Sequence, residues 1–294
     1  MSKNSIALGT FDGLHKGHLA VINEAKESAY PLLILLFNEH PLKHLTGKKP
    51  PELMSDGVFK RLTEKEKLNC YYIDFPIIAD MSPSEFFFKI LIGELNAGKI
   101  TCGENYTFGK DCKGNSQTLK ELCDKNGILC NIVKTVYYKD EPVSSTRIRK
   151  LIENGEMDDV ADMLGRPFSY CFEVIGGSKL GRTIGFPTAN QIIPDSFVQM
   201  KHGVYASAVE IDGILYPAVT NFGVRPTVDG NNLLSETHII DYSGDLYSKS
   251  IEIHLLKYLR AERKLKSTNE LSELIGKDCK KSIEIFNNSL ELLK

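Results

Sequence analysis

Two histidines three positions apart follow the first apolar run of the chain and are suited to binding a phosphate. The segment GTFDGLHKGH comes directly after Ile-Ala-Leu. Gly9 and Gly13 allow the backbone to approach a ligand closely, and His15 and His18 would lie on one face of the first turn of a helix. A helix N-terminus offers unpaired N–H groups, and two imidazoles beside it can donate hydrogen bonds to phosphoryl oxygens. The pattern therefore indicates chemistry at a nucleotide phosphate.

The histidine pair has two other interpretations. A zinc site would need a third ligand nearby, and the HExxH spacing is absent. Two structural histidines without a ligand are also common. The glycines and the position at a helix start favour phosphate binding over both.

Three further segments of the first half carry polar groups suited to the same ligand. FNEHP ends an apolar run and adds His40, and GENYTFG adds Asn105, whose amide both donates and accepts hydrogen bonds. SSTRIR opens a helix on which Ser145, Thr146 and Arg149 can hold one polyphosphate. For SSTRIR alone, an N-cap followed by charged helix positions is an equally good explanation.

A glycine-rich segment, GGSKLGRTIGFPTAN, marks a second phosphate site in the second half of the chain. It is not a Walker A loop, because GxxxxGK[ST] does not fit it. Its backbone around Gly176 and Gly181, together with Lys179, can wrap the phosphates of ATP. Thr188 and Asn190 point the same way in an extended segment and can complete a magnesium site made otherwise of phosphate and water. A plain Gly-Pro loop between strands is the alternative.

Glu236, in the run SETHIID, is a candidate proton acceptor. Phosphorylation of a primary alcohol needs a carboxylate within hydrogen-bond reach of the hydroxyl. A strand glutamate is more often a solvated surface residue, so this position alone is weak support.

The first half has the pattern of an α/β domain that could position these segments. Strands are expected at residues 6–8, 32–37, 71–75, 99–103 and 128–133, and helices at 18–28, 56–68, 83–95 and 116–126. Such alternation predicts a Rossmann-like parallel sheet with helices on both faces and ligands at the carboxyl ends of its strands.

The second half has a different pattern. Two short helices, at 146–154 and 157–164, lead to a series of short alternating strands between residues 170 and 259, separated by Gly, Asp, Asn and Pro. They predict a small antiparallel β-barrel, and the tail from residue 267 predicts one or two closing helices. We expect two domains, residues 1–166 and 167–294.

Composition restricts the class of protein. The 294 residues have a formal net charge of −2, which offers no basic field for nucleic acid. The polar N-terminus and the short apolar runs predict no signal peptide and no membrane span. The seven cysteines are scattered singly, which predicts reduced thiols. A cytoplasmic protein is expected, and the sequence does not predict its oligomeric state.

These motifs together resemble a known family. GTFDGLHKGH is similar to the HxGH signature of the nucleotidyltransferases, and the ordered blocks FNEHP, GENYTFG, SSTRIR, GFPTAN, NFGVRPTV and ETHIID resemble the bacterial bifunctional riboflavin kinase/FMN adenylyltransferases. Three positions depart from the family pattern, namely Leu36, Ser248 and Leu265. The resemblance covers about residues 5–290.

The resemblance implies two reactions and assigns residues to them. The barrel would phosphorylate riboflavin to FMN, and the sheet domain would join FMN to the AMP part of ATP, giving FAD and pyrophosphate, with Mg²⁺ bridging phosphates. The implied catalytic residues are Glu236, His15, His18 and Arg149. The adenylyltransferase site would add Gly9, Phe11, His40, Asn105, Ser145 and Thr146. The kinase site would add Gly176, Lys179, Gly181, Asn190 and Arg260, with Thr188 and Asn190 at the metal.

Two alternatives remain open from the sequence. One is a riboflavin kinase whose adenylyltransferase half is inactive, and the other is a flavin-binding regulator without catalysis. The expected partners are the small molecules riboflavin, FMN and ATP, with neither nucleic acid nor membrane.

Overall fold

The chain forms two compact units in a computed structural model that describes residues 3–177, 180–227, 230–263 and 267–293. The first unit comprises Met1–Pro50 and Leu62–Ser144, and the second comprises Pro51–Arg61 and Ser145–Lys294. The helices α7 (Ser145–Asn154) and α8 (Met157–Leu164) therefore pack with the second unit. The compact units and the two predicted domains divide the chain at different residues.

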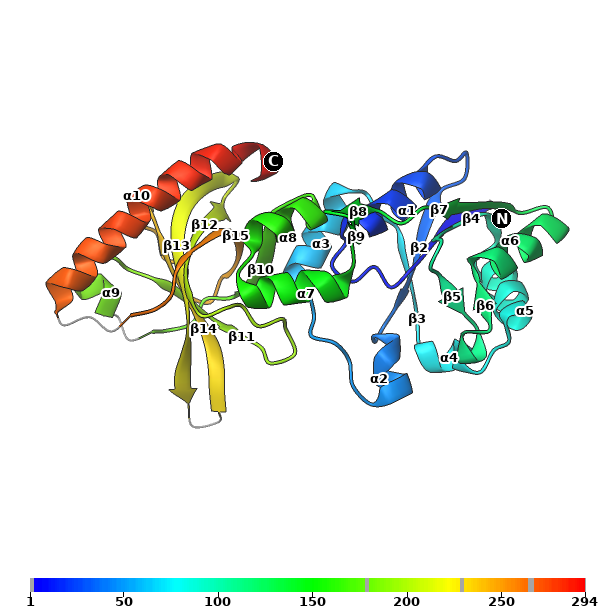
Figure 1. Cartoon of the computed structure of the whole chain (residues 1–294), viewed down its shortest axis with the longest axis horizontal. Coiled ribbons are helices and arrows are strands. Elements are labelled where there is room, and N and C mark those ends of the chain that lie inside the picture. The colour runs from blue at the N-terminus through cyan, green and yellow to red at the C-terminus, as the bar shows by residue number, and fades with distance from the viewer. Residues whose placement is uncertain (1–2, 178–179, 228–229, 264–266, 294) are drawn as a thin grey trace. The chain divides into compact units, whose positions relative to one another are not determined.

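The first unit is built on a five-stranded parallel sheet, as predicted (Figure 1). Its order is β3-β2-β1-β4-β7, with β1 (Asn4–Leu8), β2 (Leu32–Phe37), β3 (Cys70–Ile73), β4 (Ala97–Gly103) and β7 (Leu129–Val133). The chain builds outward from β1 through β2 to β3 and then returns to add β4 on the other side. In open α/β sheets, ligands bind at such a reversal, at the carboxyl ends of the strands.

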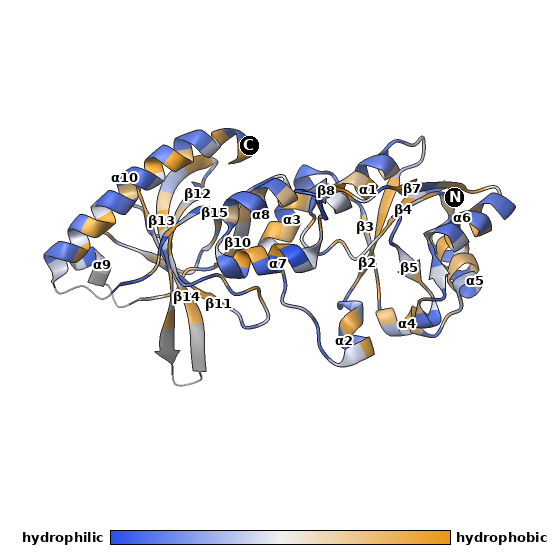
Figure 2. Cartoon of the chain, viewed as in Figure 1, coloured by the Kyte–Doolittle hydropathy of each residue, from blue (hydrophilic) through white to orange (hydrophobic). Residues whose placement is uncertain are grey.

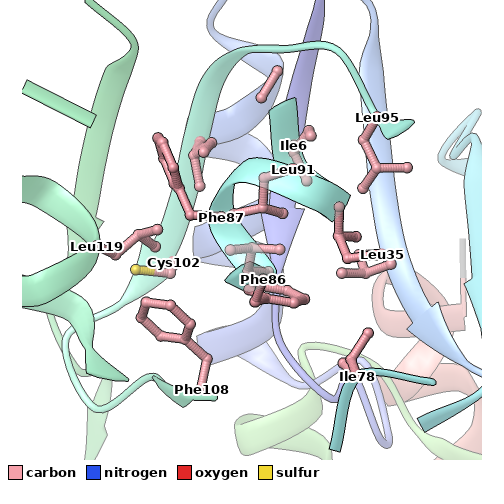
Figure 3. Close-up of a cluster of buried hydrophobic side chains, with 14 of the residues drawn as sticks. Ile6, Leu35, Ile78, Phe86, Phe87, Leu91, Leu95, Cys102, Phe108 and Leu119 are labelled. Atoms are coloured by element: carbon pink, nitrogen blue, oxygen red, sulfur yellow. The ribbon is translucent and has the colours of Figure 1, made fainter. Parts of the chain in front are cut away.

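Both faces of this sheet are covered by helices. On one face, Ile6 and Cys102 pack against the π-helix η1 (Phe86–Glu94) and α6 (Ser116–Lys125), which contribute Phe87 and Leu119 (Figure 3). Hydropathy colouring shows the same apolar strands between more polar helix surfaces (Figure 2). Because side chains alternate along a strand, the neighbours of these residues point to the opposite face. The helix α1 (Lys16–Lys26) covers that face.

A buried lysine holds the end of α1. The Nζ of Lys99 in β4 donates hydrogen bonds to the carbonyl oxygens of Glu24 at 2.6 Å and of Glu27 at 2.8 Å. A cation at these unpaired carbonyls complements the helix dipole. This contact fixes the helix whose first turn carries the histidines.

The remaining elements of the first half are short. They are α2 (Pro41–Thr46), α3 (Asp56–Lys65), α4 (Phe75–Ala79), α5 (Pro83–Glu85), η2 (Lys110–Cys112), and the two-stranded pairs β5 (Thr107–Phe108) with β6 (Gly114–Asn115) and β8 (Tyr137–Tyr138) with β9 (Glu141–Pro142). The sequence did not predict α2 or α4, because stretches of five or six residues carry too little periodicity to be recognised.

The second unit is a nearly closed six-stranded antiparallel barrel, as predicted. Its order is β10-β15-β12-β13-β14-β11, with β10 (Phe168–Glu173), β11 (Ala189–Ile193), β12 (Gly203–Ile211), β13 (Ile214–Thr227), β14 (Gly230–Ile239) and β15 (Ser250–Arg260). An isolated bridge, in which Ile175 N donates to Asn190 O at 2.8 Å, joins the two ends of the sheet. A short helix, α9 (Leu180–Thr183), lies between β10 and β11.

A single closing helix, α10 (Thr268–Leu293), lies against the outside of the barrel, drawn in red in Figure 1. Phe286 packs against the small residues Ala206 and Ala208 of β12, which let the helix approach the strand. The side chains of β12 at even positions therefore face outward, and those at odd positions face the interior.

The interior of the barrel contains a chain of hydroxyl groups. Ser207 and Thr220 are 2.8 Å apart, Thr220 and Thr237 are 2.9 Å apart, and the Tyr170 hydroxyl lies 2.5 Å from that of Ser235. All five side chains are buried. Because Ser235 and Thr237 point inward, the residue between them, Glu236, points to the outer face.

Candidate active sites

The histidine turn connects β1 to α1 through strained backbone. Phe11 has φ +51° and Leu14 has φ +43°, which are left-handed values that side chains other than glycine seldom adopt. His15 is the N-cap of α1, and its Nδ1 accepts a hydrogen bond from the backbone N of His18 at 3.3 Å. In the neutral ring this places the proton on Nε2, where it can be donated to a ligand.

The two imidazoles lie against each other. The ring centroids of His15 and His18 are 3.6 Å apart and nearly parallel, and the edge of the His18 ring meets Phe11 at 5.4 Å. A Cβ on Gly17 would lie 3.1 Å from the His15 ring, so the glycine between the histidines makes room for this stacking. Phe11 in turn packs over Gly9, where a Cβ would lie 3.2 Å from its ring.

The environment keeps His18 neutral. Burial, and to a smaller extent the neighbouring His15, lower the pKa of His18 well below its usual value of 6.5. Its Nδ1 is buried and has no hydrogen-bond partner among the described residues. A buried ring nitrogen left in this state is suited to a ligand that arrives later.

Two further predicted residues lie at the same edge of the sheet. His40 follows β2 as the N-cap of α2, and its Nδ1 accepts from Leu42 N at 3.2 Å. Asn105 lies in the turn after β4 and is exposed. Since β1 lies between β2 and β4, the structure brings the histidine turn, His40 and Asn105 to the carboxyl ends of three adjacent strands.

The fourth predicted segment, SSTRIR, starts α7 as expected and belongs to the second compact unit. Arg149 is buried, and its Nε donates to the carbonyl of Pro51 at 2.6 Å. Ser145 is half-buried and Thr146 is exposed. Their convergence with the histidine turn stays a prediction.

Three polar residues form one row across the outer face of the barrel. Glu236 in β14 lies directly opposite Asn190 of β11 and directly opposite Asn221 of β13. Directly opposed residues in antiparallel strands share a face, with Cβ atoms about 5 Å apart. Asn190 is 4% exposed, and its Oδ1 has no hydrogen-bond partner among the described residues. Its Nδ2 donates a long hydrogen bond of 3.4 Å to Thr188 O.

The glycine-rich loop lies close to Asn190. A Cβ on Gly177 would lie 2.3 Å from Asn190 Nδ2, and a Cβ on Gly181 would lie 2.3 Å from the carbonyl oxygen of Phe186. Only glycine lets the backbone approach so closely. A Cβ on Gly176 would meet nothing within 4 Å, and Lys179 lies outside the described residues.

Sequence reasoning missed a residue that holds this loop. The Nδ1 of His238 lies 2.9 Å from the carbonyl oxygen of Pro187, and its ring meets Phe186 at 5.2 Å. His238 lies two residues after Glu236 and therefore on the same face of β14. The block ETHIID did indicate His238, since polar residues at alternate positions of a strand lie on one face, and such a polar face can bind a ligand.

Arg260, predicted to bind ATP or flavin, ends β15 and pairs with α10. Its Nη2 donates to Asp278 Oδ2 at 2.7 Å, and its Nε lies 3.1 Å from the same oxygen. Its Nη1 donates to Ala261 O at 3.2 Å. The ligand role of Arg260 stays a prediction, while its contacts here anchor the end of β15.

Two features are absent from the described residues. These residues contain no group of three or more His, Cys, Asp or Glu side chains able to hold a metal ion. In the part of the chain that the structure describes, no helix is both long and apolar enough to span a bilayer. All seven cysteines are free thiols.

Known proteins resemble both halves of the chain. A family model described as FAD synthetase matches residues 1–147, and one described as riboflavin kinase matches residues 164–286. The bifunctional riboflavin kinase/FMN adenylyltransferase of Bacillus subtilis is 34% identical over 299 aligned residues, covering 98% of this chain and 94% of that protein. Its namesake from Escherichia coli K12 is 30% identical and covers 96% and 92%.

A crystal structure has the same fold over nearly the full length. It is a protein of Streptococcus pneumoniae described as a macrolide-efflux protein, with a TM-score of 0.85 and 32% sequence identity. The match covers 94% of this chain and 92% of that one. The arrangement of a parallel-sheet unit followed by a barrel is therefore shared.

Proposed function

The chain belongs to the family of bifunctional riboflavin kinase/FMN adenylyltransferases, and on this premise we propose how its residues divide the two reactions. The enzyme phosphorylates riboflavin to FMN with ATP and adenylylates FMN with a second ATP to give FAD. The proposed boundary between the two catalytic domains is 166/167. It is supported by the left-handed cap of α8 at Gly165, φ +77°, and by the start of β10 at Phe168.

In the adenylylation reaction, a phosphate oxygen of FMN attacks the α-phosphorus of ATP, and the bond to the β-phosphate breaks to release pyrophosphate. We assign the histidine turn to the α-phosphate, because the turn holds two imidazoles between β1 and α1, and Nδ1 of His18 has no partner in the described protein. Imidazole donors stabilise charge that develops on the phosphoryl oxygens. His40 and Asn105 lie at neighbouring strand ends and are assigned to the same nucleotide. The proposed roles of Ser145, Thr146 and Arg149 rest on the family motif.

In the kinase reaction, Glu236 takes the proton of the primary hydroxyl of riboflavin as that oxygen attacks the γ-phosphorus of ATP, and ADP leaves. This assignment is supported by the strand register, which places Glu236 directly between Asn190 and Asn221 on one face of the barrel. The loop at Gly177 packs onto Asn190 and is proposed to hold the phosphates on that side of Glu236.

The residues at this row fit a magnesium ion. The ion prefers oxygen ligands and usually binds through one or two protein oxygens plus phosphates. Asn190 offers a buried Oδ1 that has no partner in the described part of the chain, and Thr188, two residues earlier, is half-buried and offers a hydroxyl. A bound Mg²⁺ would neutralise phosphate charge.

Riboflavin, FMN and ATP are the proposed partners of the two sites. The cytoplasmic location predicted from the sequence remains part of this proposal. The assignment of both activities is tested by incubating the pure protein with riboflavin, ATP and Mg²⁺ and separating the flavins. We expect FMN first and then FAD. Accumulation of FMN without FAD would indicate an inactive adenylyltransferase half, and no consumption of ATP would indicate a flavin-binding regulator.

A further inference from the structure

A second carboxylate extends the row of polar residues on the barrel. Asn221 Nδ2 donates a hydrogen bond to Glu262 Oε1 at 2.8 Å. The row therefore runs from Asn190 through Glu236 and Asn221 to Glu262, with the proposed base inside it. No motif of the sequence singled out Glu262.

The backbone of β13 is shaped to admit this carboxylate. A Cβ on Gly223 would lie 2.8 Å from Glu262 Oε1, so any larger residue there would push the carboxylate away. Gly223 is two residues after Asn221 and lies on the same side of the strand. Glycine at this position thus keeps Glu262 in contact with Asn221.

The position of Glu262 is fixed from the other side by the end of β15. Arg260 is held by the buried carboxylate of Asp278, and a Cβ on Gly203 would lie 2.4 Å from the Arg260 carbonyl oxygen. The chain therefore leaves β15 at an anchored residue, and Glu262 follows two positions later. This anchoring limits the positions that its carboxylate can reach.

The two ends of the row have different chemistry. On the side of Asn190 lie the glycine loop and the oxygens suited to Mg²⁺ and phosphate. On the side of Asn221 lie an amide oxygen and a carboxylate, which can accept hydrogen bonds from hydroxyl groups, and the negative charge of the carboxylate would repel phosphate. A substrate whose terminal hydroxyl reaches Glu236 must extend away from the nucleotide, toward Asn221 and Glu262.

We propose that Asn221 and Glu262 bind the interior hydroxyl groups of the ribityl chain of riboflavin. The proposal rests on the assignment of Glu236 as base. Because Nδ2 of Asn221 is engaged by Glu262, its Oδ1 is left to accept from a substrate hydroxyl, and Glu262 can accept a charge-assisted hydrogen bond from another. The pair would select a polyol chain and set the distance between its end and the base.

The test compares two flavins in the kinase reaction. Riboflavin carries interior hydroxyls, and 10-(5-hydroxypentyl)flavin keeps the terminal hydroxyl at the same chain length but lacks the others. For Glu262→Ala we expect kcat/KM for riboflavin to fall about 10- to 100-fold, mainly through KM, as for loss of a hydrogen bond to a charged group. For the hydroxypentyl flavin, kcat/KM should stay within twofold of the wild type.

Four variants complete the experiment. Glu262→Gln keeps an acceptor oxygen and should retain part of the preference for riboflavin over the hydroxypentyl flavin. Asn221→Ala should lose this preference, and the double variant Asn221→Ala/Glu262→Ala should lose little more than either single variant. Glu210→Ala removes an exposed glutamate of β12 outside the row and should behave as the wild type. Equal losses with both flavins for Glu262→Ala, or no loss with either, would overturn the proposal.

The base assignment is tested separately by Glu236→Gln. This variant should lose phosphorylation of both flavins, whereas Glu262→Ala should lose the preference between them. Retention of kinase activity in Glu236→Gln would refute the proposed base without regard to the result at Glu262. Thermal unfolding of each variant shows that the barrel is intact.

Discussion

At the scale of single residues, the histidine turn holds two uncharged imidazoles in the proposed adenylyltransferase site. His15 has its proton fixed on Nε2 by the bond from the His18 backbone, and His18 is kept uncharged by burial. The two rings stack on each other, Phe11 contacts the His18 ring, and Gly17 leaves room for the His15 ring. The proposed binding of a triphosphate would therefore need little rearrangement of these rings, and preorganised donors are the most effective kind.

Replacement of His18 by Ala should slow adenylylation of FMN by a few hundredfold, because loss of one donor to transition-state charge costs about 3 to 4 kcal/mol. Formation of FAD from FMN and ATP is the measurement. His202→Ala, which removes an exposed histidine of the second unit, serves as the control and should leave the rate unchanged. A loss below tenfold would show that His18 does not contact the reacting phosphate.

Asn190 is the corresponding residue in the barrel. Replacement by Ala should lower riboflavin phosphorylation by about 100-fold or more, since it removes a proposed ligand of the metal and phosphates. The free energy of unfolding without ligands should change by only about 1 kcal/mol, because the side chain has one long hydrogen bond and a buried oxygen without a partner. Kinase assays and urea unfolding measure the two effects, and a strong loss of stability would point to a structural role instead.

At the scale of elements, the proposed kinase site depends on close contact between a loop and a strand. The glycine loop after β10 can lie on Asn190 of β11 only because residue 177 has no side chain. His238 of β14 lies in hydrogen-bond contact with the carbonyl oxygen of Pro187. Because His238 lies two residues after the proposed base, this contact keeps the loop near Glu236. The buried hydroxyls of Ser235 and Thr237 fix the inner side of the same strand.

Gly177→Ala should reduce kinase activity roughly 100-fold, because the added methyl group would displace Asn190, and displacements of about 1 Å have effects of this size. Adenylylation of FMN should be unaffected. Gly276→Ala in α10 is the matched control, since a Cβ there meets nothing within 4 Å. Equal activity of the two variants would contradict the close contact between the loop and β11.

A partly buried ion cluster links β15 to α3. Arg61 donates to both oxygens of Glu252, at 2.6 and 2.7 Å, and Glu252 lies 3.7 Å from His254. Burial lowers the pKa of His254 to about 4, opposed by the charge of Glu252 and supported by those of Arg61 and Arg166. Residues 51–61 are thus fastened to the barrel although they precede most of the first unit in sequence.

This cluster predicts a dependence of stability on pH. Above pH 6.5 His254 is neutral in both the folded and the unfolded chain, so it has no effect. As the pH falls from 6.5 toward 4, the unfolded chain takes up a proton that the folded protein does not, and the free energy of unfolding falls by about 2 kcal/mol at pH 5. His254→Gln should lack this decrease. Urea unfolding of both proteins at pH 7.5 and 5.0 measures it, and parallel decreases would refute the role of His254.

At the scale of the whole molecule, two folds of different construction are joined in one chain. The proposed adenylyltransferase site lies at the strand ends of a parallel sheet, whereas the proposed kinase site lies on the outer face of the barrel, between strands and a loop. The histidine turn is proposed to stabilise phosphate charge in adenylylation, and Asn190 with a bound Mg²⁺ is proposed to do so in the kinase reaction. The two reactions should therefore be separable by mutation.

The variants His18→Ala and Glu236→Gln should each lose one reaction only. The first should convert riboflavin to FMN without FAD, and the second should convert FMN to FAD but leave riboflavin unchanged. A mixture of the two proteins should again make FAD from riboflavin, because FMN released by one can bind the other. Flavin separation by chromatography measures all three cases, and loss of both reactions in either single variant would contradict the division.

The sequence alone determined the fold class and the family. Hydrophobic periodicity predicted the five parallel strands and the main barrel strands, because burial imposes a repeat of two on strands and of 3.6 on helices. The glycines and histidines of the first turn, and the glycine loop of the second half, pointed to phosphate because their chemistry is local. Short helices such as α2 and the residues that contact Asn221 left no comparable pattern.

Only the tertiary structure decided which distant residues meet. The pairing of Glu236 with Asn190 and Asn221 follows from strand register, and the contact of Glu262 with Asn221 joins positions 41 residues apart. The grouping of residues 51–61 and α7 with the barrel likewise follows from contacts such as that of Arg61 with Glu252. Contacts of this kind depend on how packed elements align in space, and one sequence carries no direct record of that alignment.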